Sequence, residues 1–180
     1  MKFLWPCIWC LLLISCKEVS FEVPQPKGVA SLKEIPTSLQ GQYLSYNEIS
    51  GEASDTLIIE AQGYHFKDKN DNDWLGQGRL GDSLVVKLYQ DIYFINFRVE
   101  DQWVLRLIRK KHSKAIEFLS IDINDDTKRK ELLRKLSKRF EVLEVQKGDD
   151  TFYQINPSPR QLMRLIEDDF FTAQELNKIN

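Results

Sequence analysis

The sequence predicts a mainly β protein of the α+β class. An antiparallel meander curls into a barrel or half-barrel, with two or three C-terminal helices. Short apolar runs alternate with polar residues from Gly41 onward. The connections between these runs are short and often contain Gly, Asn or Asp. After about residue 125 the apolar period becomes that of a helix. Within this class we expect a lipocalin-like architecture, although the chain shows no lipocalin signature motif.

The composition is that of an ordinary globular protein. The 180 residues are 42% hydrophobic and 29% charged, with 25 basic and 27 acidic side chains. This composition excludes an intrinsically disordered or low-complexity chain. The even charge balance gives no reason to expect nucleic acid as a partner. The length fits one folded unit, and we expect a single β-rich domain over residues 37–180.

The amino-terminal sixteen residues carry the most specific signal in the chain. Lys2 is followed by an almost unbroken apolar run from Phe3 to Ile14. Twelve helical residues span about 18 Å, against roughly 30 Å of membrane hydrocarbon. The run is therefore typical of a signal peptide rather than of a transmembrane helix. It ends in the sequence Leu13-Ile14-Ser15-Cys16.

This ending resembles the lipobox of bacterial lipoproteins, and the chain looks most like small lipoproteins of Bacteroidota. The resemblance covers only these sixteen residues. It implies that residues 1–15 are a signal peptide, cleaved between Ser15 and Cys16. It also implies that Cys16 carries diacylglycerol on its thiol and an acyl group such as palmitate on its new amino group. The membrane would then be a partner through the lipid anchor on Cys16.

The resemblance also implies a location. Lys17 follows Cys16 where lipoproteins retained in the inner membrane of enteric bacteria have aspartate. We therefore expect the outer membrane, on either the periplasmic or the cell-surface side. An ordinary secretory signal with an incidental cysteine is the alternative.

Few residues remain for thiol or metal chemistry. Cys7 and Cys10 lie in the predicted signal peptide, and Cys16 is the remaining cysteine. His65 and His112 are the only histidines. We therefore expect neither a disulfide nor a metal site of the zinc type, and no motif indicates a cofactor.

The segment from residue 16 to residue 36 is expected to be a flexible tether. It contains Pro24, Pro26, Gly28 and Pro36 and shows no sustained apolar period. Such a segment would hold the folded domain clear of the lipid headgroups.

The predicted strands follow in order along the chain. They are Gly41–Tyr46, Asp55–Glu60, Tyr64–Asp68, Ser83–Tyr89, Ile92–Val99, Trp103–Lys110 and Ala115–Ile121, and then a hairpin of Val142–Gln146 and Thr151–Ile155.

The two central strands show the period of two most clearly. On one strand Tyr93, Ile95, Phe97 and Val99 alternate, and on the next Trp103, Leu105 and Leu107 do so. We expect these two sets to pack against each other. The opposite face, with Asn96, Arg98, Arg106 and Lys110, is expected to be solvated.

Helical patterns follow the strands. Leucines at residues 132, 133 and 136 mark one face of a helix over Asp126–Arg139. Ser158-Pro159-Arg160-Gln161 supplies an N-cap, a proline at the first helical position and a capping box for a second helix. Thr172–Glu175 is the candidate start of a short third helix.

Three motifs suggest chemistry, but their context argues against it. Gly81-Asp82-Ser83-Leu84 spells the signature of the GDSL esterases, yet a strand follows it and Arg109 stands where the catalytic Asp before His112 should be. Residues 76–81 fit the G-x-G-x-x-G pattern without the helix that binds phosphate. Residues 68–73 resemble the start of a calcium loop but lack its later Gly and Glu. A hairpin loop is the preferred interpretation there, and a non-standard calcium site is the alternative.

Charge is uneven along the chain. Residues 109–139 hold eleven Lys or Arg against five Asp or Glu. Such a segment is either a solvated helix surface or a surface that approaches anionic headgroups or an acidic partner.

These observations predict a membrane-anchored envelope lipoprotein that acts as a non-enzymatic binding or structural module. The expected partner is a small apolar ligand inside the β-domain or an envelope protein on its surface. An envelope hydrolase acting on glycan, lipid or peptide is the alternative, and no residue is singled out as catalytic.

Overall fold

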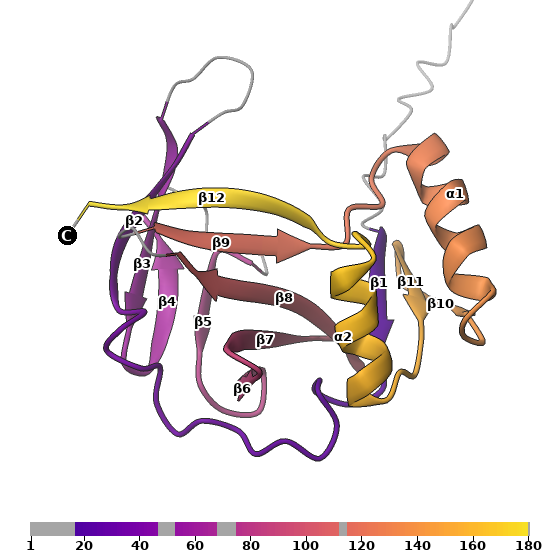
Figure 1. Ribbon diagram of the computed structural model, residues 1–180, viewed down its shortest axis with the longest axis horizontal. Coiled ribbons are helices and arrows are strands. Elements are labelled where there is room, and N and C mark those ends of the chain that lie inside the picture. Colours follow the sequence, from indigo (N-terminus) through magenta and orange to yellow (C-terminus); the bar gives the residue numbers. More distant parts are fainter. Residues whose placement is uncertain (1–16, 47–52, 68–74, 112–114, 180) are drawn as a thin grey trace, which may run out of the picture.

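The computed structural model describes residues 17–46, 53–67, 75–111 and 115–179, which form twelve strands and two helices (Figure 1). The strands are β1 (Lys17–Phe21), β2 (Gly41–Tyr46), β3 (Ala53–Glu60), β4 (Gly63–Phe66), β5 (Gln77–Arg79), β6 (Leu84–Tyr89), β7 (Ile92–Val99), β8 (Gln102–Lys110), β9 (Ala115–Ser120), β10 (Leu143–Lys147), β11 (Asp150–Gln154) and β12 (Thr172–Lys178). The helices are α1 (Asp126–Ser137) and α2 (Pro159–Glu167). The expected mainly β class is confirmed.

All twelve strands belong to one sheet, in which β8 is the branch point. The strand order is β10-β11-β1-β8-β9-β12-β2-β3-β4-β5, and β6 and β7 extend from the other edge of β8. On its first edge β8 pairs with β1 near Val104 and with β9 from Leu107 onward. The sheet is not closed into a barrel, so the closed alternative of the prediction does not hold.

The strands β7 and β8 have two buried faces, which corrects the predicted pairing. Ile95 lies opposite Arg106, whereas Leu105 lies opposite Asn96. The two predicted apolar sets therefore lie on different faces of the sheet. The hairpin sets this register, because its turn leaves only two residues between Val99 and Gln102, and a shift of one residue moves every side chain to the other face.

The predicted solvated face is only partly solvated. Arg98 and Lys110 are exposed as expected, but Asn96 and Arg106 are buried. The reason is that β1 and the chain that follows it cover this part of the sheet. Arg106 donates two hydrogen bonds to the Glu18 carboxylate on β1, at 2.6 and 3.1 Å.

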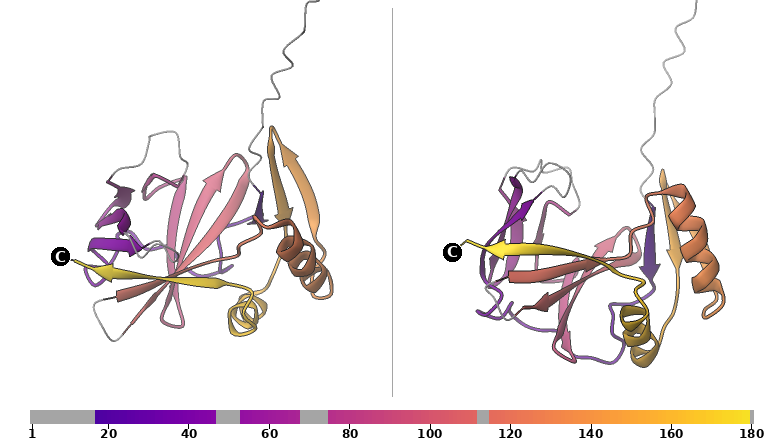
Figure 2. Two further views of the ribbon diagram at one scale, coloured as in Figure 1. Left: turned by 90° about the horizontal axis from the view of Figure 1, so that it is seen from above. Right: turned by 45° about the horizontal axis from the view of Figure 1, so that its top comes forward.

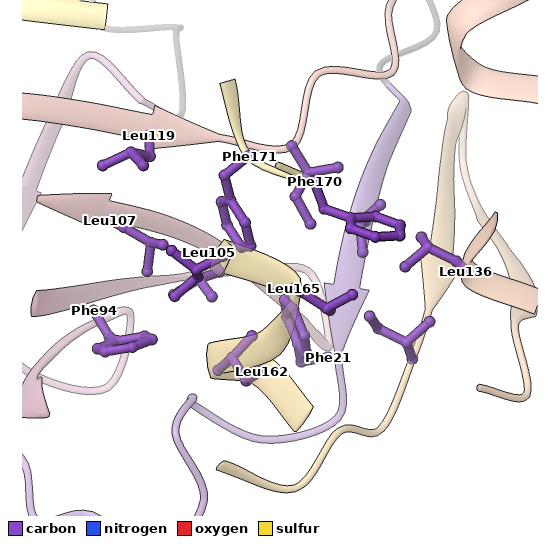
Figure 3. Packing of buried hydrophobic residues seen from close by; sticks show 14 of the residues in the cluster. Phe21, Phe94, Leu105, Leu107, Leu119, Leu136, Leu162, Leu165, Phe170 and Phe171 are labelled. Carbon is purple, nitrogen blue, oxygen red and sulfur yellow. The ribbon is translucent and has the colours of Figure 1, made fainter. Parts of the chain in front are cut away.

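Two hydrophobic cores lie on the two faces of β7 and β8. The first, called here the helix-side core, packs both helices against the sheet (Figure 3). It contains Val19, Phe21, Ile92, Phe94, Leu105, Leu107, Leu119, Ile121, Ile123, Leu136, Ile155, Leu162, Leu165, Ile166, Phe170 and Phe171. The second, the cavity-side core, contains Ile35, Leu39, Tyr43, Leu57, Ile59, Leu84, Val86, Tyr93, Ile95, Phe97, Ile108, Ile116 and Leu176.

The two predicted helices form, and the third does not. The capping box at Ser158 and Gln161 is present in full at the start of α2. Residues Thr172–Lys178 instead form β12, which pairs with β9 over six residues and with β2 at its end. The chain reverses after α2 through Asp169, whose φ is 57°. Pairing on both edges outweighs a sequence that is weakly apolar.

The expected flexible tether is the largest difference between prediction and structure. β1 lies inside the sheet, parallel to β11 and antiparallel to β8. Its Val19 and Phe21 are buried in the helix-side core. Residues 22–40, called here the strap, then run across the molecule to β2 (Figures 1 and 2). The prolines in this region therefore belong to an ordered crossing and not to a linker.

Candidate functional site

The cavity-side core encloses the main candidate site, a cavity of about 390 Å³. Its walls come from both ends of the curved sheet, with one side made by β3 and β4 and the other by β6, β7 and β8. It is lined by Ile35, Leu39, Asp55, Leu57, Ile59, Tyr64, Phe66, Leu75, Leu84, Val86, Ile95, Phe97, Ile108, Phe118, Gln174 and Leu176. The volume falls in the range typical of small-molecule sites, and the lining is predominantly apolar as such sites are.

The strap connects β6 to the turn between β3 and β4, and β6 pairs with neither of these two strands in the sheet. Leu32 N donates to Val86 O on β6, and Ile35 N donates to Ala61 O at the turn after β3, both at 2.8 Å. The strap therefore spans from β6 to the β3–β4 turn, and places the Ile35 and Leu39 side chains in the cavity lining.

A buried polar cluster fixes the beginning of the strap to the outside of β6 and β7. The Asn96 side chain accepts from Gln25 N at 2.6 Å and donates to Gln25 O at 2.8 Å. The Lys87 ammonium donates to the carbonyls of Pro24 and Pro26 at 2.8 and 3.0 Å. Burial lowers the pKa of Lys87 from the ordinary lysine value. These polar contacts hold the beginning of the strap, whereas Ile35 and Leu39 further along it pack in the cavity-side core.

The other end of the strap is held by Tyr43. Its side chain is almost fully buried, and its hydroxyl donates to Leu39 O at 2.9 Å. Burial raises the pKa of this hydroxyl, so it remains a donor at physiological pH. The cavity lining contributed by Leu39 is therefore fixed by a hydrogen bond from the neighbouring strand.

Aromatic side chains shape one wall of the cavity. The Tyr64 ring makes edge-to-face contacts with Phe66 and Phe97, at centroid distances of 6.2 and 5.8 Å. Its hydroxyl donates to Leu75 O at 2.9 Å. Gly78 on β5 allows this placement, because a Cβ there would lie 2.6 Å from the Tyr64 ring.

Two polar side chains, Asp55 and Gln174, stand among the apolar residues of the lining. The Asp55 carboxylate accepts from Thr56 N at 2.8 Å. Both residues are at least partly exposed, so the cavity has a polar border where it meets solvent. An apolar molecule with one polar end would match this arrangement.

The contribution of the strap to the cavity was not predicted, because most of this segment was expected to be a flexible tether. The signal present in the sequence is the spacing of Leu32, Ile35 and Leu39 on either side of Pro36. These three side chains all pack in or against the cavity-side core. The spacing does not identify the β-sheet face that the segment covers, because the contacts are made over long sequence distances.

Several residues considered from sequence lie outside the described residues. These are the predicted cleavage and lipidation residues Ser15 and Cys16, the loop at residues 68–73 and His112. His65 is half-buried on β4.

Ser83 of the GDSL tetrapeptide is exposed, and it precedes the strand β6 as expected. In the part of the chain that the structure describes, no three His, Cys, Asp or Glu residues gather as metal ligands would.

The basic segment at residues 109–139 is divided between two ends of the molecule (Figure 1). Arg109 and Lys111 both pair with Glu117 on β9, with Arg109 at 3.3 Å. Lys110 ends β8 at this same end of the molecule, and Lys114 lies outside the described residues. The other seven cations lie on α1 and the two residues after it, beyond the far end of β9. The structure therefore makes a basic helix rather than one continuous basic patch.

Comparison with protein-family models, with curated proteins and with solved structures finds no match to this chain. Among the described residues, neither helix has the length and apolar content that crossing a membrane requires.

Proposed function

We propose that this protein is an outer-membrane lipoprotein whose β-domain binds a small apolar ligand without chemical conversion. The observation that supports it is the cavity of about 390 Å³ between the two walls of the curved sheet. The curved sheet with an internal cavity also supports the finer architecture proposed for the fold, a half-barrel of lipocalin-like plan.

The composition of the lining argues for an apolar ligand. Side chains such as Leu57, Val86 and Ile95 offer no hydrogen bonds, and a site lined in this way binds apolar molecules in preference to water. Burial contributes roughly 25 cal/mol per Å² of apolar surface removed from water. Asp55 and Gln174 at the border would then orient a polar end of the ligand toward solvent.

The ligand proposal is tested with a matched pair of substitutions on β3. Leu57 lines the cavity, whereas Ile58 is its neighbour on the opposite face. We expect an apolar fluorescent naphthylamine to bind the wild type and to be displaced by single-chain fatty acids. Leu57→Trp should abolish this binding by filling the cavity, and Ile58→Trp should retain it.

The result is read by fluorescence titration and by thermal unfolding, because a ligand that binds only the folded state raises the unfolding temperature. Equal binding by Leu57→Trp and wild type would place the ligand elsewhere. A wild type that binds neither the dye nor the fatty acids would contradict the proposal that the β-domain binds a small apolar ligand.

The anchor is proposed on separate grounds, from the signal-like residues 1–15 and the lipobox-like sequence that ends in Cys16. The resemblance to bacterial lipoproteins makes the Cys16 thiol the site of diacylglycerol attachment. Two or three acyl chains suffice for stable anchoring, since each buried CH₂ contributes about 0.8 kcal/mol.

Metabolic labelling with a clickable fatty acid tests the anchor. We expect label on the wild type and none on Cys16→Ala. Protease treatment of intact cells then decides between the cell surface, where the β-domain is cleaved, and the periplasmic side, where it is protected. Label that persists in Cys16→Ala, or a wild type without label, would contradict lipidation at this residue.

A further inference from the structure

We infer that the outer face of α1 is a docking surface for anionic lipid headgroups, an inference that rests on the proposed lipid anchor at Cys16. The helix and the two residues after it, residues 126–139, hold seven basic side chains and two acidic ones. The basic residues are Lys128, Arg129, Lys130, Arg134, Lys135, Lys138 and Arg139.

Three of these seven cations are neutralised within the fold. Arg129 is buried and pairs with Asp126. Lys135 lies 2.8 Å from Glu131, and Arg139 lies 2.6 Å from Asp168. Both acidic side chains of the segment are therefore engaged, and Lys130 and Arg134 also help to lower the pKa of Asp126 and of Glu131. With seven cations against two carboxylates, the segment keeps an excess of positive charge.

Three of the four remaining cations form a line on the solvent side of the helix. Lys130, Arg134 and Lys138 are exposed and are spaced by four residues, so they lie above one another along the helix. Arg129 and Leu136 mark the buried side. Among the ion pairs of the described residues, none includes a cation of this line.

The start of α1 lies next to Lys17, the residue that follows the proposed anchor residue Cys16 in the sequence. The Lys17 ammonium is 4.0 Å from the Asp126 carboxylate at the first residue of α1. Lys17 is also the first residue of β1. Figures 1 and 2 show α1 on the outside of the molecule, beside the start of β1. Lipid on Cys16 would bring one end of this helix to the bilayer.

Charge and position together select the occupant. A lipid chain combined with a basic surface is a common pair of membrane-binding signals. Each cation close to an anionic surface strengthens binding by about fivefold. An acidic protein would match the charge equally, but the anchor brings a lipid surface to this end of the molecule. We therefore assign the face to lipid.

Lysine footprinting of the lipidated wild-type protein tests the assignment. The protein is reconstituted into vesicles of phosphatidylcholine alone, or into vesicles that also contain phosphatidylglycerol. An amine-acetylating reagent and mass spectrometry then give the modification rate at each lysine. We expect Lys130 and Lys138 to react at least about fivefold more slowly on the anionic vesicles. The exposed Lys33 and Lys110, which lie away from α1, should react equally on both.

Salt and substitution make the test specific. The protection should disappear at about 1 M salt, where the Debye length falls to about 3 Å. In the double variant Arg134→Gln with Lys138→Gln, Lys130 should lose most of its protection. The matched variant Lys33→Gln with Lys110→Gln removes two other exposed cations and should retain it.

The outcomes separate this inference from the anchor. Acyl label on Cys16 with equal rates on both vesicles would retain the anchor and overturn docking by α1. Without acyl label, the protein is simply mixed with the vesicles. Protection confined to the anionic vesicles would then support the α1 face even though the anchor had failed, and equal rates would overturn both.

Discussion

Glu18 and Arg106 form the most buried ion pair within the part of the chain that the structure describes. Their side chains are 12% and 8% exposed, and two hydrogen bonds join them. Removing one partner of a buried pair takes away the nearest counter-charge of the other, which costs up to about 3–5 kcal/mol. This pair therefore holds β1 to β8.

We predict that Glu18→Ala lowers the free energy of unfolding by about 3 kcal/mol, measured by urea denaturation. The double variant Glu18→Met with Arg106→Met should regain most of this loss, because neither charge remains buried. The exposed pair of Asp101 and Lys147 is the control, and Asp101→Ala should lower the free energy of unfolding far less, because solvent screens an exposed ion pair. Equal losses for Glu18→Ala and Asp101→Ala would contradict the prediction.

Lys87 should make the free energy of unfolding depend on pH. Burial lowers its pKa below the ordinary 10.5. Between the lowered value and 10.5 the unfolded chain binds more protons at this group than the folded protein does. The contribution of Lys87 to the free energy of unfolding therefore rises with pH through this window. Tyr43 acts in the opposite direction above its ordinary value of 10.0, because burial raises the pKa of its hydroxyl.

Comparison with Lys87→Met isolates the effect, because Tyr43 is common to both proteins. The free energy of unfolding of the wild type minus that of the variant should increase from neutral pH to about pH 10. Denaturant unfolding across this pH range measures the difference. A difference that does not change with pH would mean that Lys87 titrates like an exposed lysine.

At the scale of elements, local signals succeeded where they agreed with the tertiary contacts. β2 and β7 begin and end at the predicted residues, and α2 has the predicted capping box. β1 and β12 were missed because their sequences, KEVSF and TAQELNK, are only weakly apolar. Each is nevertheless paired on both edges. Such pairing depends on strands far away in the sequence, so the local sequence does not predict it.

The role of β1 is tested by two neighbouring apolar residues. Phe21 is fully buried in the helix-side core, whereas Val23 is 40% exposed on the strap. Phe21→Ala should lower the free energy of unfolding by about 3–5 kcal/mol, as for other large core residues. Val23→Ala should change it by about 0.5 kcal/mol or less.

Urea unfolding of the two variants gives both values. A flexible tether over residues 16–36 would tolerate both substitutions equally. Such a result would remove β1 from the structured domain and would place the folded part farther from Cys16.

At the scale of the whole molecule, the cavity depends on the two-sided wall formed by β7 and β8. The continuous apolar runs of these strands indicate burial on both faces, and the alternation considered alone led to the wrong pairing. Residues that line the cavity come from seven strands, from the strap and from Leu75 ahead of β5. The sequence predicts that an apolar interior exists, but only the register of β8 decides that Ile108 faces the cavity and Leu107 does not.

An unfilled cavity lacks packing contacts, so a larger side chain in its lining should stabilise the fold. Val86 and Val104 are both fully buried, but only Val86 lines the cavity. Val86→Ile adds one methylene group where space exists, and should raise the free energy of unfolding by up to about 0.8 kcal/mol. Val104→Ile adds the same group to a fully buried site that does not line the cavity, and should lower it by about 1 kcal/mol or more.

Urea unfolding without ligand measures both changes, and their opposite signs are the test. Changes of the same sign would mean that the cavity closes when it is empty. If the signs differ, the unfilled volume is a cost that the fold retains. The stabilised Val86→Ile variant should then bind the apolar dye more weakly than the wild type, because the added group takes space from the ligand. Stability and binding would thus oppose each other at one side chain, as expected where a cavity is kept for a ligand.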